Sequence, residues 1–234
     1  MTLPVAILAG GLATRLRPLT ERIPKALVPV AGKPFVEWQL DYLSTQGIER
    51  VVICAGYLGD EIVRQIGDGG RFGLKVEYSF DGDQPLGTAG AILRALPRLG
   101  EVFFVLYGDS FLPVSFARVE AAFKGSAFAG LMTVLHNENR WDRSNVNFRN
   151  GRLLEYNKSS PSAEMEYIDY GLSILTANAM VVHHTDLPAD LSNVFRAMSL
   201  RGELGGLEVQ ERFYEIGTFG GLEEAERYFK EGSQ

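Results

Sequence analysis

Short apolar segments, separated by stretches with helical spacing, constrain the fold of this chain more than any other feature. Residues 4–9, 50–55 and 102–107 are almost entirely apolar, and a glycine follows each of them. Such segments are typical of strands that are buried on both faces of a parallel sheet. Parallel neighbours need crossover connections, so the pattern predicts an α/β fold. Apolar residues at helical spacing place the expected helices at 33–46, 58–66 and 88–96.

The second half of the chain has a different spacing of expected strands. Strand-like segments here are separated only by turns, which indicates mixed or antiparallel pairing. No linker or repeat interrupts the sequence. We therefore interpret residues 1–234 as one α/β domain with a Rossmann-like, mostly parallel mixed sheet flanked by helices. The remaining expected elements are strands at 74–80, 129–135, 146–148, 152–156, 170–175 and 213–216, and a closing helix at 221–229.

Composition excludes several classes of protein. The chain is 46% hydrophobic with a net charge of −6, which argues against disorder and against a nucleic-acid partner. Its single cysteine, Cys54, can form neither an internal disulfide nor a zinc site, and this favours a reducing, cytoplasmic setting. No apolar run approaches the roughly 18 residues of a membrane span, and the N-terminal run is too short for a signal peptide. We expect no membrane partner, and the sequence leaves a homo-oligomer open.

A glycine loop follows the first expected strand. Gly10 and Gly11 allow the backbone to approach a ligand, and bare N–H groups can cradle phosphate oxygens. Arg15 adds a permanently charged donor. The loop has the spacing of neither a dinucleotide fingerprint nor a Walker P-loop. On glycine content alone, an ordinary turn with a surface arginine remains an equal alternative.

A second segment, 24–30, is held rigid by Pro24 and Pro29. Lys25 lies between apolar neighbours there, and a fixed ammonium group can neutralise charge on a transferring phosphorus. A solvated surface lysine is the commoner alternative.

The two segments together resemble the sugar-nucleotide pyrophosphorylase family, which has Gly-Gly-x-Gly-Thr-Arg-Leu followed by Pro-Lys-x-x-x-Pro. This chain departs from the pattern at Ala13, where the family usually has glycine. Residues 85–91 resemble the family's second nucleotide segment, although Thr88 could equally be a simple helix cap. The resemblance implies that the nucleotide is bound by Leu8, Ala9, Gly10, Gly11, Arg15, Lys25, Gln84, Pro85, Gly87 and Thr88.

Asp109 ends the third apolar strand and is the expected metal ligand. A carboxylate at the carboxyl end of a strand suits Mg²⁺, which prefers a few carboxylates together with phosphate oxygens. The resemblance gives Asp109 this role and implies Mg²⁺ as cofactor, with Glu215 where the family has a second aspartate. A helix cap is the alternative interpretation of Asp109.

The resemblance also implies a sugar-phosphate site in the second half. Lys158 matches the family's phosphate-binding lysine, and Asn157 stands where a glutamate is common. Asn145 stands where many relatives have glycine, and Asp169 and Gly171 align with the strand of the sugar pocket. Residues of about 1–112 would then bind the nucleotide, and residues of about 113–234 the sugar phosphate.

The resemblance implies an enzyme that forms a nucleotide sugar and pyrophosphate from a nucleoside triphosphate and a sugar 1-phosphate. Arg15, Lys25, Asp109 and Lys158 would carry the catalysis. Among the compact members, guanylyl transfer to heptose or mannose 1-phosphate is the preferred interpretation. A uridylyltransferase of sugar or amino-sugar 1-phosphates and a non-catalytic nucleotide-sugar-binding homologue are the alternatives.

Two other motifs are given weaker interpretations. Asp81-Gly82-Asp83 could hold a metal and diphosphate in a glycosyltransferase, but a turn before Pro85 is favoured. His183 and His184 are adjacent and point apart, so we regard them as structural or surface residues.

Overall fold

A nine-stranded mixed sheet forms the centre of the protein. The computed structural model describes residues 2–11, 14–183 and 187–232, and the sheet is counted within them. Its first half is parallel, in the order β5 (Lys75–Phe80), β4 (Arg50–Ala55), β1 (Val5–Ala9) and β6 (Val102–Tyr107). The four carboxyl ends therefore meet at one edge. The predicted parallel α/β core is confirmed.

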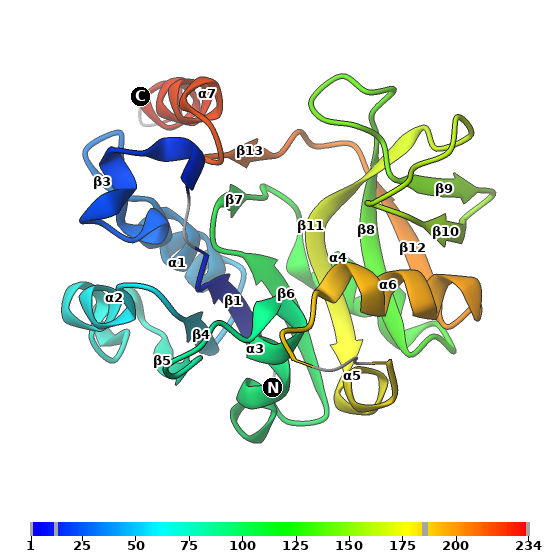
Figure 1. Ribbon diagram of the computed structural model, residues 1–234, viewed down its shortest axis with the longest axis horizontal. Coiled ribbons are helices and arrows are strands. Elements are labelled where there is room, and N and C mark those ends of the chain that lie inside the picture. The colour runs from blue at the N-terminus through cyan, green and yellow to red at the C-terminus, as the bar shows by residue number, and fades with distance from the viewer. Residues whose placement is uncertain (1, 12–13, 184–186, 233–234) are drawn as a thin grey trace.

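The second half of the sheet is built around β11 (Tyr167–Thr176), which lies antiparallel to β6. Figure 1 shows the two halves side by side. The register of β11 against β8 shifts between Asp169 and Ser173, and Gly171 within that shift has φ +99°. A bulge of this kind bends a strand and re-aims its side chains. The other strands are β8 (Gly130–His136), β9 (Val146–Arg149), β10 (Arg152–Tyr156) and β12 (Leu204–Val209).

Helices cover both faces of the sheet because alternate strand residues face opposite sides. Val5 and Ile7 pack in the core cluster of α1 (Phe35–Thr45), α2 (Gly59–Ile66) and α4 (Phe116–Lys124). Ala6 packs in the opposite cluster, with α3 (Gly87–Leu99), α5 (Ala177–His183) and α6 (Leu191–Leu200). Within the described part of the chain, no helix combines the length and apolar character that a membrane crossing requires.

Two small two-stranded sheets flank the core. β2 (Pro29–Val30) pairs with β3 (Lys33–Pro34), so α1 begins at Phe35 instead of residue 33 as predicted. β7 (Ser110–Phe111) pairs with β13 (Tyr214–Glu215), and α7 (Phe219–Glu231) follows. This second pairing brings the end of the chain back to the end of β6.

The sequence did not predict α4, α5, α6 or β12. β12 contains two consecutive glycines, a residue type that is uncommon in strands, so its sequence does not predict a strand. A Cβ on Gly205 would lie 2.4 Å from the Phe128 ring, and one on Gly206 would lie 2.6 Å from the Phe148 ring. The strand therefore needs glycine because aromatic rings pack directly on its backbone.

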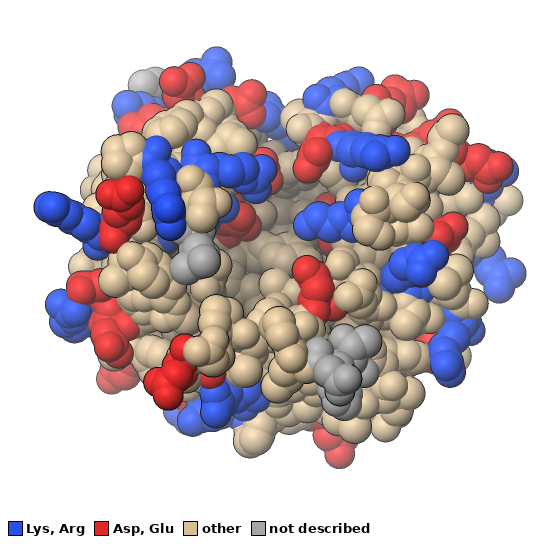
Figure 2. Space-filling view, in the orientation of Figure 1, with Lys and Arg blue, Asp and Glu red and all other residues tan. Residues whose placement is uncertain are grey.

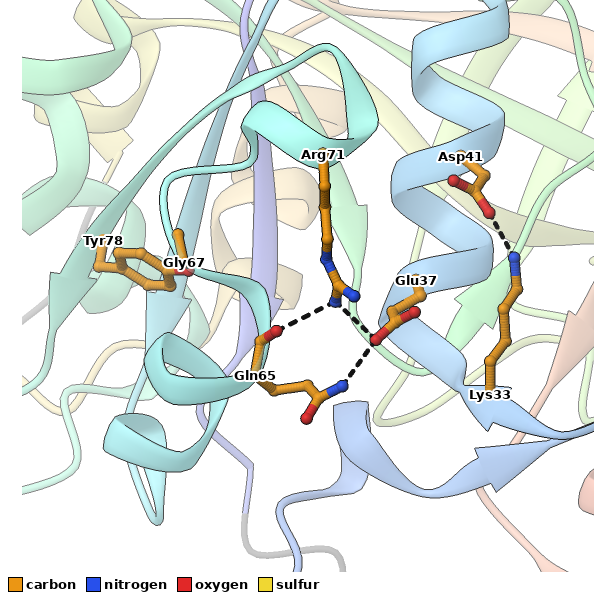
Figure 3. Close-up of polar contacts among 7 residues, drawn as sticks. All are labelled: Lys33, Glu37, Asp41, Gln65, Gly67, Arg71 and Tyr78. Carbon is orange, nitrogen blue, oxygen red and sulfur yellow. Dashed lines mark hydrogen bonds and ion pairs between the residues drawn. The ribbon is translucent and has the colours of Figure 1, made fainter.

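A buried carboxylate anchors α1 to the neighbouring helix. Oε1 of Glu37 accepts hydrogen bonds from Gln65 Nε2 at 2.8 Å and Arg71 Nη2 at 2.7 Å. Arg71 also donates to the backbone oxygen of Gln65 at 3.0 Å (Figure 3). Glu37 is 8% exposed, and a charged pair that is this well hydrogen-bonded fixes the position of α1.

Candidate functional site

A cavity of about 580 Å³ opens at the carboxyl ends of the parallel strands. Figure 2 shows the hollow in the middle of this face. In open α/β sheets, ligands bind at this edge. Eight of the ten predicted nucleotide-binding residues line it: Leu8, Ala9, Gly10, Gly11, Lys25, Pro85, Gly87 and Thr88.

Glycines allow the ends of neighbouring strands to come together beneath the cavity. A Cβ on Gly56, after β4, would lie 2.9 Å from the backbone oxygen of Gly10 and 3.1 Å from its Cα. A Cβ on Gly108, after β6, would lie 2.7 Å from the backbone oxygen of Leu8. Larger residues at Gly56 or Gly108 would push the backbones apart. The glycine after each apolar strand is therefore the sequence signal of the site.

One end of the cavity carries an ion pair. Lys25 Nζ donates to Asp109 Oδ2 at 2.5 Å, with the two side chains 17% and 30% exposed. The helix-cap interpretation of Asp109 is wrong, because β7 follows it instead of a helix. The predicted phosphate-binding lysine and metal-binding aspartate thus lie in direct contact.

Glu215 and Arg15 lie close to this ion pair. β13 pairs Glu215 with Ser110, the residue after Asp109. Burial and the negative charge of Asp109 raise the pKa of Glu215, whereas Lys25 and Arg15 lower it. A Cβ built on Gly217 would lie 3.4 Å from Arg15 Nη2, 3.5 Å from Glu215 Oε1 and 3.6 Å from Lys25 Nζ. Segments that are distant in sequence therefore supply one cluster of two cations and two carboxylates.

The two carboxylates fit a magnesium ion that is completed by a substrate. Within the described residues, no group of three or more His, Cys, Asp or Glu could hold a metal by itself. Mg²⁺ needs no such cage, since it commonly binds one or two carboxylates together with phosphate oxygens and water. Asp109 and Glu215 could supply those two ligands.

The predicted sugar residues form a connected group on the other half of the sheet. Asn145 Oδ1 accepts from the Asp169 backbone nitrogen, and the Asn145 backbone oxygen accepts from the Asn157 nitrogen, both at 2.9 Å. Asp169 Oδ1 accepts from the Gly171 nitrogen at 2.9 Å. Four of the five predicted residues are therefore joined by hydrogen bonds around the β11 bulge.

Asp169 is a carboxylate whose ionised form is disfavoured by burial. Burial raises its pKa to about 6, although the Gly171 hydrogen bond and the positive charge of Lys158 act in the opposite direction. Lys158, the fifth predicted residue, is thus near enough to act on Asp169, while its own side chain is exposed. A carboxylate that is kept in such surroundings is a candidate for ligand binding.

Tyr107 connects the two groups, and no role was predicted for it. It lines the cavity, and a Cβ on Gly171 would lie 3.5 Å from its ring. Burial, and then the charge of Asp169, raise the pKa of its hydroxyl well above the usual value, so the group stays neutral. Its place before Gly108 at the end of an apolar strand was the available signal.

Asp81 is a second residue that sequence reasoning undervalued. The backbone of residues 81–83 is a loop, in line with the favoured turn, but the Asp81 carboxylate lines the cavity. It is 9% exposed, its Oδ2 accepts from the Leu86 nitrogen at 3.4 Å, and burial raises its pKa. Asp83 also lines the cavity.

Some other predicted residues are placed differently. Gln84 is exposed and is not part of the cavity lining. Thr88 does not cap α3, because Leu86 is the capping residue; its hydroxyl accepts from the Leu191 nitrogen at 2.7 Å. His183 pairs with Glu203 at 2.5 Å, which agrees with a structural role. Ala13 and His184 lie outside the described residues.

Comparisons with known proteins identify a family model and several relatives that resemble part of the chain. A family model described as "Nucleotidyl transferase" matches residues 5–144. The chain is 48% identical over 107 residues to a glucose-1-phosphate thymidylyltransferase of Streptomyces griseus. The matched region is 45% of this chain and 30% of that protein. It is 42% identical over 111 residues to an N-acetylmuramate alpha-1-phosphate uridylyltransferase of Neisseria meningitidis. This match covers 47% of the chain and 48% of that protein.

A third relative and a solved structure extend the comparison. The D-glycero-alpha-D-manno-heptose 1-phosphate guanylyltransferase of Campylobacter jejuni is 36% identical over 114 residues, covering 49% of the chain and 51% of that protein. The matches thus span between about a third and a half of these curated relatives. HddC from Yersinia pseudotuberculosis, complexed with GMP-PN, has a TM-score of 0.80 at 23% identity and covers 97% of this chain and 100% of its own. That likeness shows the fold alone.

Proposed function

The chain belongs to the nucleotidyl transferase family, and we propose that it joins a nucleoside monophosphate to a sugar 1-phosphate and releases pyrophosphate. The observation that carries the proposal is the contact between Lys25 and Asp109 at the charged end of a glycine-lined cavity. Relatives named as thymidylyl-, uridylyl- and guanylyltransferases of sugar 1-phosphates support this reaction class.

The proposed reaction is a single in-line displacement. A phosphate oxygen of the sugar 1-phosphate forms a bond to the α-phosphorus of the triphosphate, and the bond from that phosphorus to the oxygen of the leaving pyrophosphate breaks. The nucleophile is already anionic, so no general base or covalent intermediate is needed. The protein would contribute mainly by positioning the phosphates and neutralising their charge.

Each charged residue has a place in this scheme. Arg15 would hold the leaving β- and γ-phosphates, and Lys25 would span the phosphates that react. Lys158 would hold the incoming phosphate and overcome its repulsion from the triphosphate. Asp109 and Glu215 would hold Mg²⁺, which supplies further neutralisation of the phosphate oxygens when it is bound.

The cavity gives a reason to prefer guanine. Its Lys25–Asp109 end suits phosphates, whereas the loops after β4 and β5 and the start of α3 form the other end. Asp81 follows β5, at the opposite side of the parallel half from β6. Its Oδ2 would lie 3.3 Å from a Cβ built on Gly56 and 3.5 Å from one built on Gly10, so the carboxylate is directed toward the glycine loops. We propose that the base of the bound nucleotide lies beside it.

A carboxylate at this position discriminates between bases. An ionised carboxylate can accept two hydrogen bonds from guanine, from N1–H and the N2 amino group, in one plane. Uracil and thymine offer only N3–H there, flanked by two carbonyl oxygens that a carboxylate repels. We therefore propose GTP as the nucleotide and, from the resemblance to compact family members, heptose or mannose 1-phosphate as the acceptor. A UTP-dependent reaction is the alternative, supported by the 42% identical uridylyltransferase.

A nucleotide panel tests the proposal. The wild-type protein is incubated with Mg²⁺, mannose or heptose 1-phosphate and each of GTP, UTP, dTTP and XTP, and pyrophosphate is measured. GTP should be preferred, and Asp81→Asn should lower kcat/KM for GTP on the order of 10- to 100-fold, as loss of a bidentate base contact does. The same variant should gain activity with XTP, because the asparagine amide can donate to the carbonyl that replaces the amino group of guanine. Preference for UTP by the wild type would refute the base assignment and leave the reaction class intact.

A further inference from the structure

Gln39, in the middle of α1, holds the backbone on both sides of Asp109. The residue is 2% exposed. Nε2 donates to the backbone oxygen of Tyr107 at 2.9 Å and to that of Ser110 at 2.8 Å. These two carbonyl groups flank the turn Gly108-Asp109, and one amide group therefore bridges it.

The same turn is held from two other directions. The Gly108 nitrogen donates to the backbone oxygen of Leu8 in β1 at 3.0 Å. The Ile216 nitrogen, after β13, donates to the backbone oxygen of Asp109 at 2.9 Å. Contacts from α1, from β1 and from the residue after β13 thus hold the turn. Of these contacts, the two from Gln39 are made by its side chain, and the others are made by backbone groups.

The orientation of the Gln39 amide follows from its neighbours. Two carbonyl oxygens can be contacted only by the NH₂ side of the amide, since the oxygen side would be repelled. Within the described residues, Gln39 Oε1 is buried and has no hydrogen-bond partner. A buried, unpaired oxygen destabilises a fold, whereas methionine or leucine would fill this place without it. The donor function of the amide is therefore what the position requires.

Gln39 can transmit a fixed position because α1 is itself anchored. Glu37 lies two residues before Gln39 in α1 and is bound by Gln65 and Arg71 of the adjoining segment (Figure 3). A side chain on a rigid helix locates its contacts more accurately than one on a loop.

We propose that Gln39 is a positioning residue for the metal-binding carboxylate: it sets the turn so that Asp109 faces both Lys25 and the magnesium ion. The inference rests on the proposed function, which gives Asp109 the role of metal ligand. Residues that orient the ligands of a metal commonly change metal affinity or activity 10- to 100-fold when they are replaced.

The test compares a glutamine inside α1 with the glutamine that directly follows this helix. Gln39→Met keeps the length of the side chain and removes its donor. Gln46→Met is the matched control, because Gln46 follows α1 and its Oε1 accepts from the Phe116 nitrogen at 3.3 Å, away from the turn. Mn²⁺ binding to each full-length protein is followed by electron paramagnetic resonance of the free ion, with the same concentration of a non-hydrolysable GTP analogue in every sample and in a protein-free control, because phosphate oxygens complete the proposed site. Thermal unfolding and steady-state kinetics with Mg²⁺ accompany it.

Gln39→Met should weaken Mn²⁺ binding about 10-fold and raise the Mg²⁺ concentration for half-maximal rate by a similar factor. It should also lower kcat, whereas KM for the sugar phosphate should change less than about twofold. Gln46→Met should leave Mn²⁺ binding within about twofold of wild type. Equal Mn²⁺ affinity in wild type and Gln39→Met would overturn the proposal, whatever the change in melting temperature. If Gln39→Met does not fold, Gln39→Leu provides the same comparison.

Asp109→Asn separates this inference from the proposed function. If this variant loses Mn²⁺ binding while Gln39→Met retains it, the positioning role is wrong and the metal assignment stands. If Asp109→Asn binds Mn²⁺ as the wild type does, the metal assignment fails and the role of Gln39 fails with it.

Discussion

Replacing Asp169 with asparagine should stabilise the protein and weaken its binding of sugar phosphate. Asparagine has the same shape and can keep the hydrogen bond from the Gly171 nitrogen, which Asp169 Oδ1 accepts at 2.9 Å. What changes is the charge, which burial makes unfavourable at this position. A carboxylate that is retained against this penalty is expected to serve ligand binding.

The size of the effect follows from the pKa of Asp169. It is about 6 in the folded protein, compared with the usual value of 3.8. Between these values the folded protein binds more protons than the unfolded chain, so the free energy of unfolding falls as pH rises through this window. The penalty is fully present above pH 6 and amounts to about 3 kcal/mol. At pH 5 it is about 1.5 kcal/mol, because most of the carboxyl group is then protonated.

Urea unfolding at pH 5 and pH 7.5 measures this difference. Asp169→Asn should be more stable than the wild type by about 1.5 kcal/mol at pH 5 and about 3 kcal/mol at pH 7.5. The control is Asp60→Asn, which removes an exposed carboxylate instead of a buried one. KM for the sugar phosphate should rise in Asp169→Asn while KM for the triphosphate stays unchanged. A stability difference that does not grow with pH, or a variant less stable than the wild type at pH 7.5, would refute the reasoning.

Two further substitutions test the remaining parts of the site. Lys158→Ala should raise KM for the sugar phosphate on the order of 10-fold, because the lysine is proposed to hold the incoming phosphate. KM for the triphosphate should change little. If steady-state kinetics show that only the triphosphate KM rises, the roles of Lys25 and Lys158 are reversed. Gly56→Ala should destabilise the protein by about 1–3 kcal/mol, since its Cβ would lie 2.9 Å from the backbone oxygen of Gly10. Gly11→Ala is the control in the urea assay, because among the described residues beyond its chain neighbours no atom lies within 4 Å of the Cβ it adds. Equal stability of the two variants would contradict the close packing of the strand ends.

The parallel half of the fold was predictable because its signals are local. Strands 50–55 and 102–107 were predicted with the boundaries that the structure has, since each is apolar throughout and is followed by glycine. β12 was not predictable in this way, because its glycines are explained only by the rings of Phe128 and Phe148, which are distant in sequence. Tertiary packing overrides local preference at such positions.

The site was predictable where short motifs carry its chemistry. Lys25 and Asp109 were assigned from separate segments, and the structure brings them into contact. Asp81 and Gln39 were not assigned, because a carboxylate in a turn and a glutamine in a helix are ordinary in sequence. Only the fold shows that Asp81 lines the cavity and that Gln39 reaches two carbonyl groups beside Asp109.

Transfer of a label from the α-phosphate tests the central proposal most directly. Wild-type protein is incubated with Mg²⁺, GTP labelled at the α-phosphate and mannose or heptose 1-phosphate, and the labelled products are separated. The account predicts that the label enters a nucleotide sugar, that one unlabelled pyrophosphate forms for each, and that neither forms without the sugar phosphate. Label in nucleoside diphosphate, or no turnover with any nucleoside triphosphate, would contradict it.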